Sequence, residues 1–428
     1  MFKSGEVLKM RFSRQMVTVE EAVDRLIKSL SQLGEETVQI EEAYGRILAS
    51  DAYATYELPH FDRSPLDGFA VRAADTISAS TQQPVYLRVL ETVAAGQVPQ
   101  LEVTEGCATR IMTGAMMPAG ADAVIMFEQT ENPAEHAAMV GVKRVLKPGE
   151  NVSKRGEEIA SGTVIAEAGE KINAGTIAIL ATFGYTHLSV IRQPRVGLFS
   201  TGSELLRIDQ PLVAGKIRNS NSWMLAALIK EAGGIPVLLP DLPDELAKAK
   251  KIIGEHLQEV DLLVSSGGVS VGDFDVIASL VDEPEVDLLF NKVAMRPGKP
   301  TTGMILHGKP YIALSGNPGA CFLGYELFVR LAIQQLSGVK QAGLCLIKAK
   351  LDVPYTKPCP YPRYLRGRLL EREGELFARP DFNEKAGNLG TLKDSECFIV
   401  IPAGGSGKEE GELVSVLSHA TPSWRNEG

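Results

Sequence analysis

Residues 260–276 read VDLLVSSGGVSVGDFDV and mark the change from a buried segment to a loop. Leu262, Leu263 and Val264 form an apolar run, which is typical of a strand buried on both faces of a parallel sheet. The loop after it contains almost only Ser, Gly and Val, so its backbone N–H groups can approach a ligand closely. Asp273 and Asp275 then place carboxylates at the end of the loop.

Strand-like and helix-like segments alternate on both sides of this stretch. The strand-like runs are RVGLFS (195–200), IPVLLP (235–240), VDLLV (260–264), VDLLFNKVA (286–294) and YIALS (311–315). The helix-like segments are 222–232, 243–257, 275–281 and 318–336. This alternation over about 145 residues predicts an α/β fold whose central domain is a doubly wound parallel sheet.

The flanking regions have other patterns. Residues 17–33 predict an amphipathic helix that begins with a capping box formed by Thr18 and Glu21. Short β-like runs over 83–150 predict a small β-rich domain, and repeated turn signals over 148–175 predict an extended connection. Residues 343–428 return to short strands, which favours a C-terminal β-barrel or sandwich.

Length and composition exclude several classes of protein. The 428 residues are too many for one ordinary core, so several domains are expected. The net charge of −9 argues against a general nucleic-acid binder, which needs basic residues to neutralise phosphates. No apolar run approaches the ~20 residues that cross a membrane, and residues 1–15 lack the apolar segment of a secretory signal. Five scattered cysteines suit a reducing cytoplasm and predict neither a zinc site nor disulfides.

Three strands of the predicted sheet end in loops of the same chemical type, and parallel strands present such loops at one edge of a sheet. The loops are 200–204, 265–272 and 315–319. We expect their backbone amides to bind a phosphate-bearing ligand, although tight βα turns would explain any single loop. The candidate binding residues are Ser200, Thr201, Gly202, Ser266, Gly267, Gly268, Ser270, Gly272, Gly316 and Asn317. None of the loops has the lysine of a Walker A motif.

Charged side chains occur beside these loops. Glu204 and Asp275 can share a Mg²⁺ ion with a diphosphate, or each can be a residue that favours a helix N-terminus. Lys292, Arg296 and Lys299 in KVAMRPGKP can turn toward an anionic ligand or lie in a solvated loop. Far upstream, Asp67 precedes Gly68 in a turn, and its spacing does not assign it to the edge of the sheet.

Five segments together resemble the molybdopterin molybdenumtransferase family, which includes the bacterial MoeA type and the E domain of gephyrin. They are FDRSPLDGFAVR (61–72), RIMTGAMMPAGADAVIMFEQ (110–129), STGSEL (200–205), SSGGVSVGDFD (265–275) and RPGKP (296–300). The resemblance extends in order from about residue 16 to residue 425. SSGGVSVG together with DGFAV and TGAMMP is a specific combination.

The resemblance implies four domains. They are an elongated domain from 16–55 plus 150–185, a β-rich domain at 56–149, an α/β molybdopterin-binding domain at 186–340 and a C-terminal β domain at 343–428. It also implies a cytoplasmic homodimer in which the active site is shared between subunits. Molybdopterin adenylyltransferase is then the expected upstream partner, and neither nucleic acid nor membrane is expected.

The reaction that the resemblance implies is the insertion of molybdenum from molybdate into adenylylated molybdopterin. The adenylyl diphosphate is cleaved, AMP leaves, and Mg²⁺ is the expected cofactor. Carried over by motif, the catalytic set is Asp67, Thr113, Glu204 and Asp275, with Glu204 and Asp275 as metal ligands. The basic set is Lys292, Lys299 and Arg366, and Glu158 is a weaker candidate where the family usually has Asp.

The chain departs from the family pattern at several positions. Ser315 and Ala320 differ from LPGNPVS, Arg296 stands where Lys is frequent, and Lys385-Ala386 stand where serines are usual. A variant that prefers tungstate and a non-catalytic scaffold that binds molybdopterin therefore stay as alternatives. The adenylyltransferase and the competence-damage proteins are disfavoured, because they lack DGFAV and TGAMMP in this arrangement.

We expect Asp275→Ala to leave the fold intact and to impair turnover, because the change removes one ligand of the expected Mg²⁺. Circular dichroism measures the first property and the rate of AMP release measures the second. A normal rate in the variant would reject the assignment of Asp275 to a metal site.

Overall fold

The computed structural model describes residues 15–131, 138–243, 245–269, 276–381 and 387–419. The chain forms two compact units. Unit 1 consists of Met1–Ala49, Gly169–Asn173 and His187–Gly428, and unit 2 consists of Ser50–Ala168 and Ala174–Thr186. Ser270, Gly272, Asp275, Lys385 and Ala386, which the sequence analysis singled out, lie outside the described residues.

The main sheet of unit 1 has six strands in the order β14-β11-β15-β18-β17-β16. Four neighbours are parallel: β14 (Ile235–Leu238), β11 (Arg195–Ser200), β15 (Leu262–Ser266) and β18 (Lys309–Leu314). The predicted α/β fold class is confirmed, but the sheet is mixed, because β17 (Thr302–Leu306) and β16 (Val286–Phe290) run antiparallel. The sequence analysis missed β17. Its two-residue connection to β18, His307-Gly308, has positive φ at both positions and can join only antiparallel strands.

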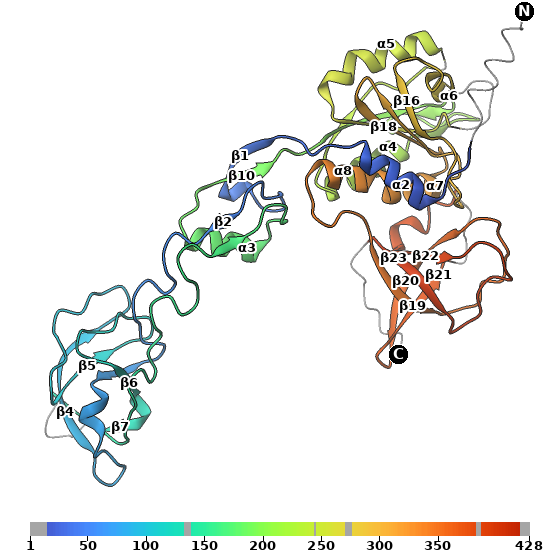
Figure 1. Ribbon diagram of the computed structural model, residues 1–428. Coiled ribbons are helices and arrows are strands. Elements are labelled where there is room, and N and C mark those ends of the chain that lie inside the picture. The colour runs from blue at the N-terminus through green and yellow to red at the C-terminus, as the bar shows by residue number, and fades with distance from the viewer. Residues whose placement is uncertain (1–14, 132–137, 244, 270–275, 382–386, 420–428) are drawn as a thin grey trace, which may run out of the picture. The chain divides into compact units, whose positions relative to one another are not determined.

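Helices cover both faces of this sheet (Figure 1). Along β15, Leu262 and Val264 pack into one apolar core and Leu263 packs into the other, as expected for a strand with side chains on alternating faces. The first core receives α2 (Val19–Lys28), α4 (Asn221–Glu231), α7 (Pro318–Gly324), the π-helical segment Tyr325–Val329 and α8 (Arg330–Leu336). The second receives α5 (Leu246–His256) and α6 (Val276–Leu280).

Two helix ends agree with their sequence signals. In the predicted capping box of α2, Thr18 Oγ1 accepts from Glu21 N at 3.1 Å and Glu21 Oε2 accepts from Thr18 N at 2.9 Å. At the end of α4, Gly233 N donates to Lys230 O and Gly234 N donates to Ile229 O. Gly233 has φ +93°, so α4 ends in a Schellman motif at the Gly-Gly pair.

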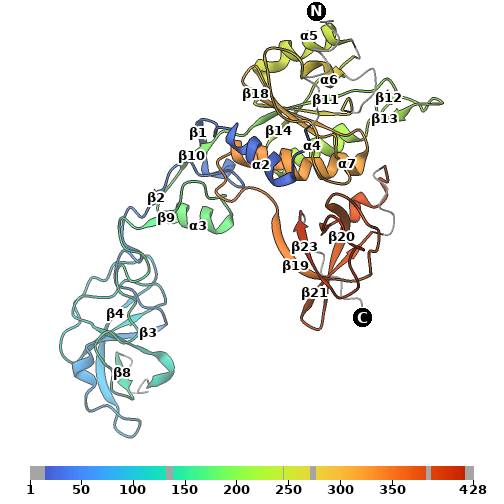
Figure 2. The same ribbon diagram turned by 45° about the vertical axis from the view of Figure 1, so that its right-hand side comes forward.

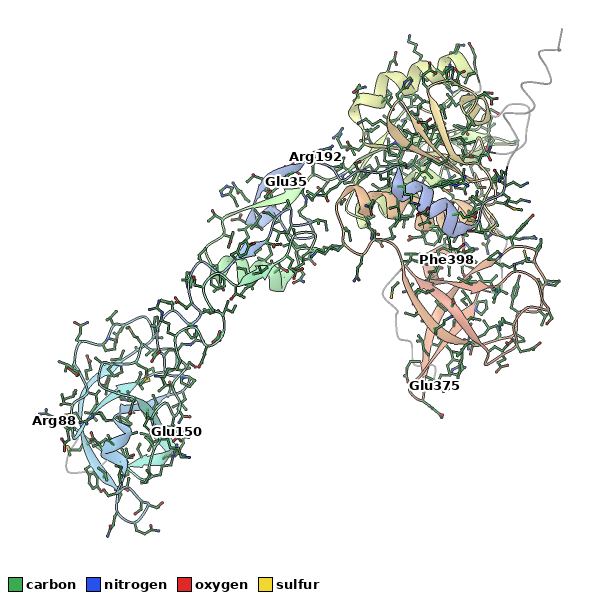
Figure 3. The ribbon with its side chains drawn as sticks, viewed as in Figure 1. Glu35, Arg88, Glu150, Arg192, Glu375 and Phe398 are labelled. Carbon is green, nitrogen blue, oxygen red and sulfur yellow. The ribbon has the colours of Figure 1, made fainter. Side chains whose placement is uncertain are left out.

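Unit 1 also contains a closed barrel at its C-terminal end, in the order β19-β21-β20-β22-β23. Its strands are β19 (Cys345–Leu351), β20 (Arg363–Arg372), β21 (Glu375–Pro380), β22 (Cys397–Ile401) and β23 (Leu413–Ser418). The barrel contacts the α/β part through Phe398, which Figure 3 labels and whose ring centroid lies 5.5 Å from that of Phe322 on α7. Arg296 N donates to Pro362 O at 3.0 Å, and Tyr364 N donates to Arg296 O at 2.9 Å. The barrel is therefore joined to the RPGKP segment.

Two short ladders complete unit 1. In the first, β1 (Glu35–Gln39) pairs antiparallel with β10 (His187–Ile191). In the second, β12 (Leu205–Leu206) pairs parallel with β13 (Ile217–Arg218). The 3₁₀ turns of this unit are Ile40–Glu42, Leu257–Glu259 and Leu392–Asp394.

Unit 2 is built on a six-stranded sheet in the order β6-β3-β5-β4-β8-β7. The strands are β3 (Gly68–Val71), β4 (Val85–Val93), β5 (Cys107–Ile111), β6 (Ala123–Met126), β7 (Thr130–Glu131) and β8 (Met139–Val142), with 3₁₀ turns at Ala73–Thr76 and Phe127–Gln129. A ladder of β2 (Ala52–Tyr53) with β9 (Val164–Ala166) and the helix α3 (Ala174–Thr182) also belong to it. The four-domain division inferred from the resemblance stays a prediction.

None of the helices in the described residues is long and apolar enough to cross a membrane.

Two glycines test the packing from opposite directions. A Cβ on Gly68 of β3 would lie 2.0 Å from Ile125 O on the paired strand β6, so Gly68→Ala should lower the free energy of unfolding of unit 2 by about 2–3 kcal/mol.

Gly254 lies within α5 and a Cβ there meets nothing within 4 Å, so Gly254→Ala should raise the free energy of unfolding of unit 1 by about 0.5–1 kcal/mol. Urea denaturation followed by circular dichroism measures both. Wild-type stability in Gly68→Ala would contradict the pairing of β3 with β6.

Candidate functional site

The three glycine loops meet at one edge of the main sheet, because they follow the adjacent parallel strands β11, β15 and β18. They line a cavity of about 1440 Å³. The structure brings together there, from the predicted set, Thr201, Gly202, Glu204, Ser266, Gly267, Gly268, Arg296, Lys299, Gly316 and Asn317. Their roles in binding stay predictions.

Glycine is required where the first two loops approach each other. Gly267 and Gly268 have φ +90° and +68°, and a Cβ would lie 2.6 Å from Thr201 O in the first case and 2.7 Å from Thr201 Oγ1 in the second. Gly202 has φ +140°, and a Cβ there would lie 2.6 Å from Glu204 Oε2. Close packing against Thr201 therefore explains why residues 267 and 268 lack side chains, in addition to the expected ligand contact.

Polar residues at the start of α4 connect the loops to one another. Asn219 Nδ2 donates to Ser200 Oγ at 2.7 Å, and Asn219 Oδ1 accepts from Ser222 N at 3.1 Å. Asn221 Nδ2 donates to Gly316 O at 2.9 Å. The sequence analysis missed Asn219 and Asn221 as cavity residues. The segment RNSNS (218–222) carries a signal, but asparagine and serine directly before the predicted helix 222–232 are equally typical of a helix start.

Ser200 lies beneath the cavity and is not part of its lining. It is 1% exposed, and its Oγ lies 2.6 Å from Ser222 Oγ in addition to the contact from Asn219. The hydroxyl therefore supports the first loop from below.

The lining in the described part of the chain is strongly cationic. Among the described lining residues, the basic side chains are Lys216, Arg218, Arg296 and Lys299. The acidic side chain among them is Glu204. Lys299 Nζ lies 3.3 Å from Tyr361 Oη and 4.8 Å from the centroid of that ring. The sequence analysis missed Lys216 and Arg218, which belong to a turn-rich segment without a motif. It also missed Tyr361, which lies between strands β19 and β20 of the barrel.

Cys359 also lines the cavity. Burial raises the pKa of its thiol, but a hydrogen bond from the Tyr361 backbone and the guanidinium of Arg363 outweigh burial, so the net pKa lies below the usual value.

Lys292 and Arg366 lie outside the cavity lining. Lys292 follows β16, and its carbonyl accepts from Val17 N at 3.0 Å. Arg366 is buried on β20, its Nη1 donates to Asn388 O at 2.9 Å, and burial lowers its pKa. Since Gly387 and Leu389 line the cavity, Arg366 holds the backbone of a lining segment.

Asp67 and Thr113 belong to unit 2, where they contact each other. Thr113 N and Thr113 Oγ1 donate to Asp67 Oδ1 at 2.7 and 2.8 Å. These two bonds, the backbone one first, hold the pKa of Asp67 below its usual value. Glu158, also in unit 2, forms an ion pair of 2.7 Å with Arg63.

Glu204 is the described member of the predicted metal-binding pair, since Asp275 lies outside the described residues. Among the residues that the structure describes, no three His, Cys, Asp or Glu side chains are grouped as metal ligands. A Mg²⁺ site does not need such a group, because Mg²⁺ is usually held by one or two carboxylates and substrate phosphates. The exposed carboxylate of Glu204, within the first glycine loop and the cavity lining, fits that ion.

Three parts of the chain match models of known protein families. Residues 17–184 match the model of the MoeA N-terminal region (domain I and II), residues 197–335 match that of a probable molybdopterin binding domain, and residues 348–418 match that of the MoeA C-terminal region (domain IV). The chain belongs to the MoeA family.

Individual relatives span nearly the whole chain. A molybdopterin molybdenumtransferase of Bacillus subtilis is 42% identical over 406 residues, which is 94% of each chain. One of Staphylococcus epidermidis is 38% identical over 97% of this chain and 98% of its own. The crystal structure of a molybdopterin biosynthesis MoeA protein from Pyrococcus horikoshii is similar with a TM-score of 0.81 at 30% identity, and it covers 95% of this chain and 100% of that one.

We expect Thr113→Val to raise the pKa of Asp67 but to leave it below its usual value, because the hydroxyl bond is lost and the backbone bond remains. NMR titration of the Asp67 carboxyl carbon measures this change. Because the folded pKa is depressed, the Thr113 contacts stabilise unit 2 fully above the unfolded pKa of about 4 and lose their effect as the pH falls through the folded pKa.

The carboxyl of Asp62 is an internal control for the same titration. Lys154 and the Arg155 backbone lower its pKa, so the Thr113 change should leave it unaltered. An unchanged Asp67 pKa would show that the hydroxyl bond does not persist in solution.

Proposed function

We propose that this protein inserts molybdenum from molybdate into adenylylated molybdopterin, cleaving the adenylyl diphosphate and releasing AMP. Membership of the MoeA family supports the proposal, as do the relatives named molybdopterin molybdenumtransferase that align with 94–97% of the chain. The alternatives of a tungstate-preferring variant and a non-catalytic scaffold are not favoured.

The observation that supports this reaction most strongly is the cavity at the edge of the main sheet. Three glycine loops and four cations converge there in a protein whose net charge is −9, so the local charge is suited to an anion. The cavity volume of about 1440 Å³ exceeds the ~300–1,000 Å³ of ordinary ligand pockets. A ligand with two ring systems joined by a diphosphate fits these properties.

The residues of the cavity have distinct tasks in the proposed reaction. The backbone amides of the glycine loops bind the diphosphate oxygens and hold the P–O–P bond that breaks. Arg296 and Lys299 provide fixed positive charge for molybdate and for the charge that develops on the departing phosphate. The ring and hydroxyl of Tyr361 keep the Lys299 ammonium in place.

Mg²⁺ is the cofactor we propose, held by Glu204 and Asp275. When bound it would neutralise the phosphate oxygens. The carboxylate of Glu204 belongs to the first glycine loop and to the cavity lining.

The quaternary arrangement is part of the proposal. Asp67 and Thr113 belong to a different compact unit from the cavity, and a homodimer with a shared active site gives them a role. We also propose the cytoplasm as the location and molybdopterin adenylyltransferase as the upstream partner, because it would supply the adenylylated substrate. Ser315 and Ala320 line the cavity, so the departures from the family pattern lie where substrate would bind.

The test uses the purified full chain with adenylylated molybdopterin, Mg²⁺ and molybdate. Chromatography measures AMP release, which should depend on molybdate and should accompany formation of molybdenum cofactor. Release with tungstate alone would establish the tungstate variant, and binding without release under either oxyanion would establish the scaffold.

Glu204→Gln is the matched active-site variant, since it keeps the size of the side chain and removes its charge. We expect AMP release to fall by about 10²-fold with an unchanged circular dichroism spectrum, as for the loss of one electrostatic contact in a transition state. A rate within about twofold of wild type would remove Glu204 from the metal site.

A further inference from the structure

Within the described part of the chain, Arg110 differs from the other arginines of unit 2, because its guanidinium makes no hydrogen bond or ion pair. The others have side-chain partners: Arg63 pairs with Glu158, Arg72 with Asp75, Arg144 with Glu150 and Arg155 with Glu57, and Arg88 donates to Cys107 Sγ at 3.8 Å. Arg110 is exposed near the end of β5. The five N–H donors of its guanidinium are therefore available to a ligand.

An aromatic ring, rather than a carboxylate, holds this guanidinium. Arg110 Cζ lies 5.1 Å from the centroid of the Phe127 ring. Phe127 in turn packs edge-on against Phe69, with 5.3 Å between the two ring centroids. A cation over the face of a ring is attracted by the π electrons, and this attraction occupies none of the N–H donors. The contact therefore fixes the cation and leaves its hydrogen-bonding capacity free.

The register of the sheet places Arg110 on the same face as Asp67. Arg110 of β5 is paired directly with Phe69 of β3, a strand that Figure 2 labels, and Asp67 lies two residues before Phe69. Side chains two residues apart along a strand point to the same face, so Arg110 and Asp67 form a diagonal pair within reach of a long side chain. In agreement with this placement, the two bonds from Thr113 lower the pKa of Asp67 most, and the charge of Arg110 lowers it further.

Arg110, Asp67 and Thr113 therefore form one exposed polar surface on unit 2. The backbone N–H and the hydroxyl of Thr113 both donate to Asp67 Oδ1, so Thr113 fixes the carboxylate and has no further proton to donate. Of the three residues, Arg110 is the one whose donors can bind an anion.

We propose that Arg110 binds a tetrahedral oxyanion of the reaction, either molybdate or a phosphate of the substrate, beside Asp67. A planar guanidinium can donate to two oxygens of such an anion at once. The carboxylate of Asp67 repels an oxyanion, and the positive charge of Arg110 offsets that repulsion. This inference rests on the proposed function, in which Asp67 acts on the substrate, and it adds to that reaction an anion-binding residue that belongs to unit 2.

Steady-state AMP release by the full chain tests the role of Arg110. Arg110→Gln removes the charge, and we expect kcat/KM to fall about 10–100-fold, as for the loss of a hydrogen bond to a charged group. Arg110→Lys keeps the charge without the planar fork and should recover part of the loss. A higher KM for molybdate would identify molybdate as the ligand, and a higher KM for the adenylylated substrate would identify its phosphate.

Arg88→Gln is the matched control. Arg88 is an exposed arginine of the neighbouring strand β4, is labelled in Figure 3, and contacts Cys107, three residues before Arg110 on β5. An odd separation along a strand puts Cys107 and Arg110 on opposite faces of the sheet. The kcat/KM of Arg88→Gln should stay within about twofold of wild type, and circular dichroism should show that both variants are folded.

A binding measurement on the full chain tests the same residue without turnover. The probes are sulfate, a tetrahedral dianion like molybdate, and pyrophosphate. An oxyanion bound to Arg110 adds negative charge near Asp67, so either probe should raise the pKa of Asp67, followed by NMR at its carboxyl carbon. Arg88→Gln should respond as the wild type does, whereas the probes should leave the Asp67 pKa unchanged in Arg110→Gln.

Three outcomes would overturn the anion site. They are wild-type kcat/KM in Arg110→Gln, equal losses of kcat/KM in Arg110→Gln and Arg88→Gln, and an Asp67 pKa that neither probe changes in the wild-type protein. A lower midpoint of urea denaturation for Arg110→Gln together with wild-type kcat/KM would show that Arg110 only covers the Phe127 ring.

The two kinds of measurement separate this inference from the proposed function. A probe effect on Asp67 that depends on Arg110, without molybdate-dependent AMP release by the wild type, would keep the anion site and reject the reaction. Molybdate-dependent release that is unaltered in Arg110→Gln would reject the anion site and keep the reaction.

Discussion

The parallel pairing of β11, β15 and β18 is the constraint on which the candidate site depends. Parallel strands end at the same edge of a sheet, so three loops far apart in sequence are brought side by side. Gly267 and Gly268 then pack against Thr201, where a side chain would collide with the backbone or hydroxyl of that residue. The sheet decides where the loops lie, and glycine allows them to approach.

Charge is distributed unevenly over the chain, and this distribution matters for an anionic substrate. The protein as a whole is acidic at −9, which limits nonspecific binding to polyanions. The lining of the cavity nevertheless includes Lys216 and Arg218 from residues 205–218, and Arg296 and Lys299 from the RPGKP segment. Tyr361, between β19 and β20, contacts Lys299 there. Such clustered positive charge makes the local potential of the cavity differ in sign from the net charge of the protein, which is only an average over the whole chain.

The barrel contributes to the site through its connection to the α/β part. Hydrogen bonds between Arg296 and the Pro362–Tyr364 segment fix the RPGKP turn against the start of β20. Arg366 holds Asn388, whose neighbours Gly387 and Leu389 line the cavity. Segments separated by more than 60 residues therefore form one wall.

The α/β alternation, the capping box of α2 and the three glycine loops are predictable from the sequence, because each depends on residues close together in the chain. Only the folded chain reveals the antiparallel strand β17, the cavity positions of Asn219, Asn221, Lys216 and Arg218, and the contact of Lys299 with Tyr361. These features come from residues that are distant in sequence or lack a local pattern, and no spacing rule predicts them. Ser200 is the clearest example, since its loop was predicted correctly and only packing shows its hydroxyl to be buried beneath the cavity.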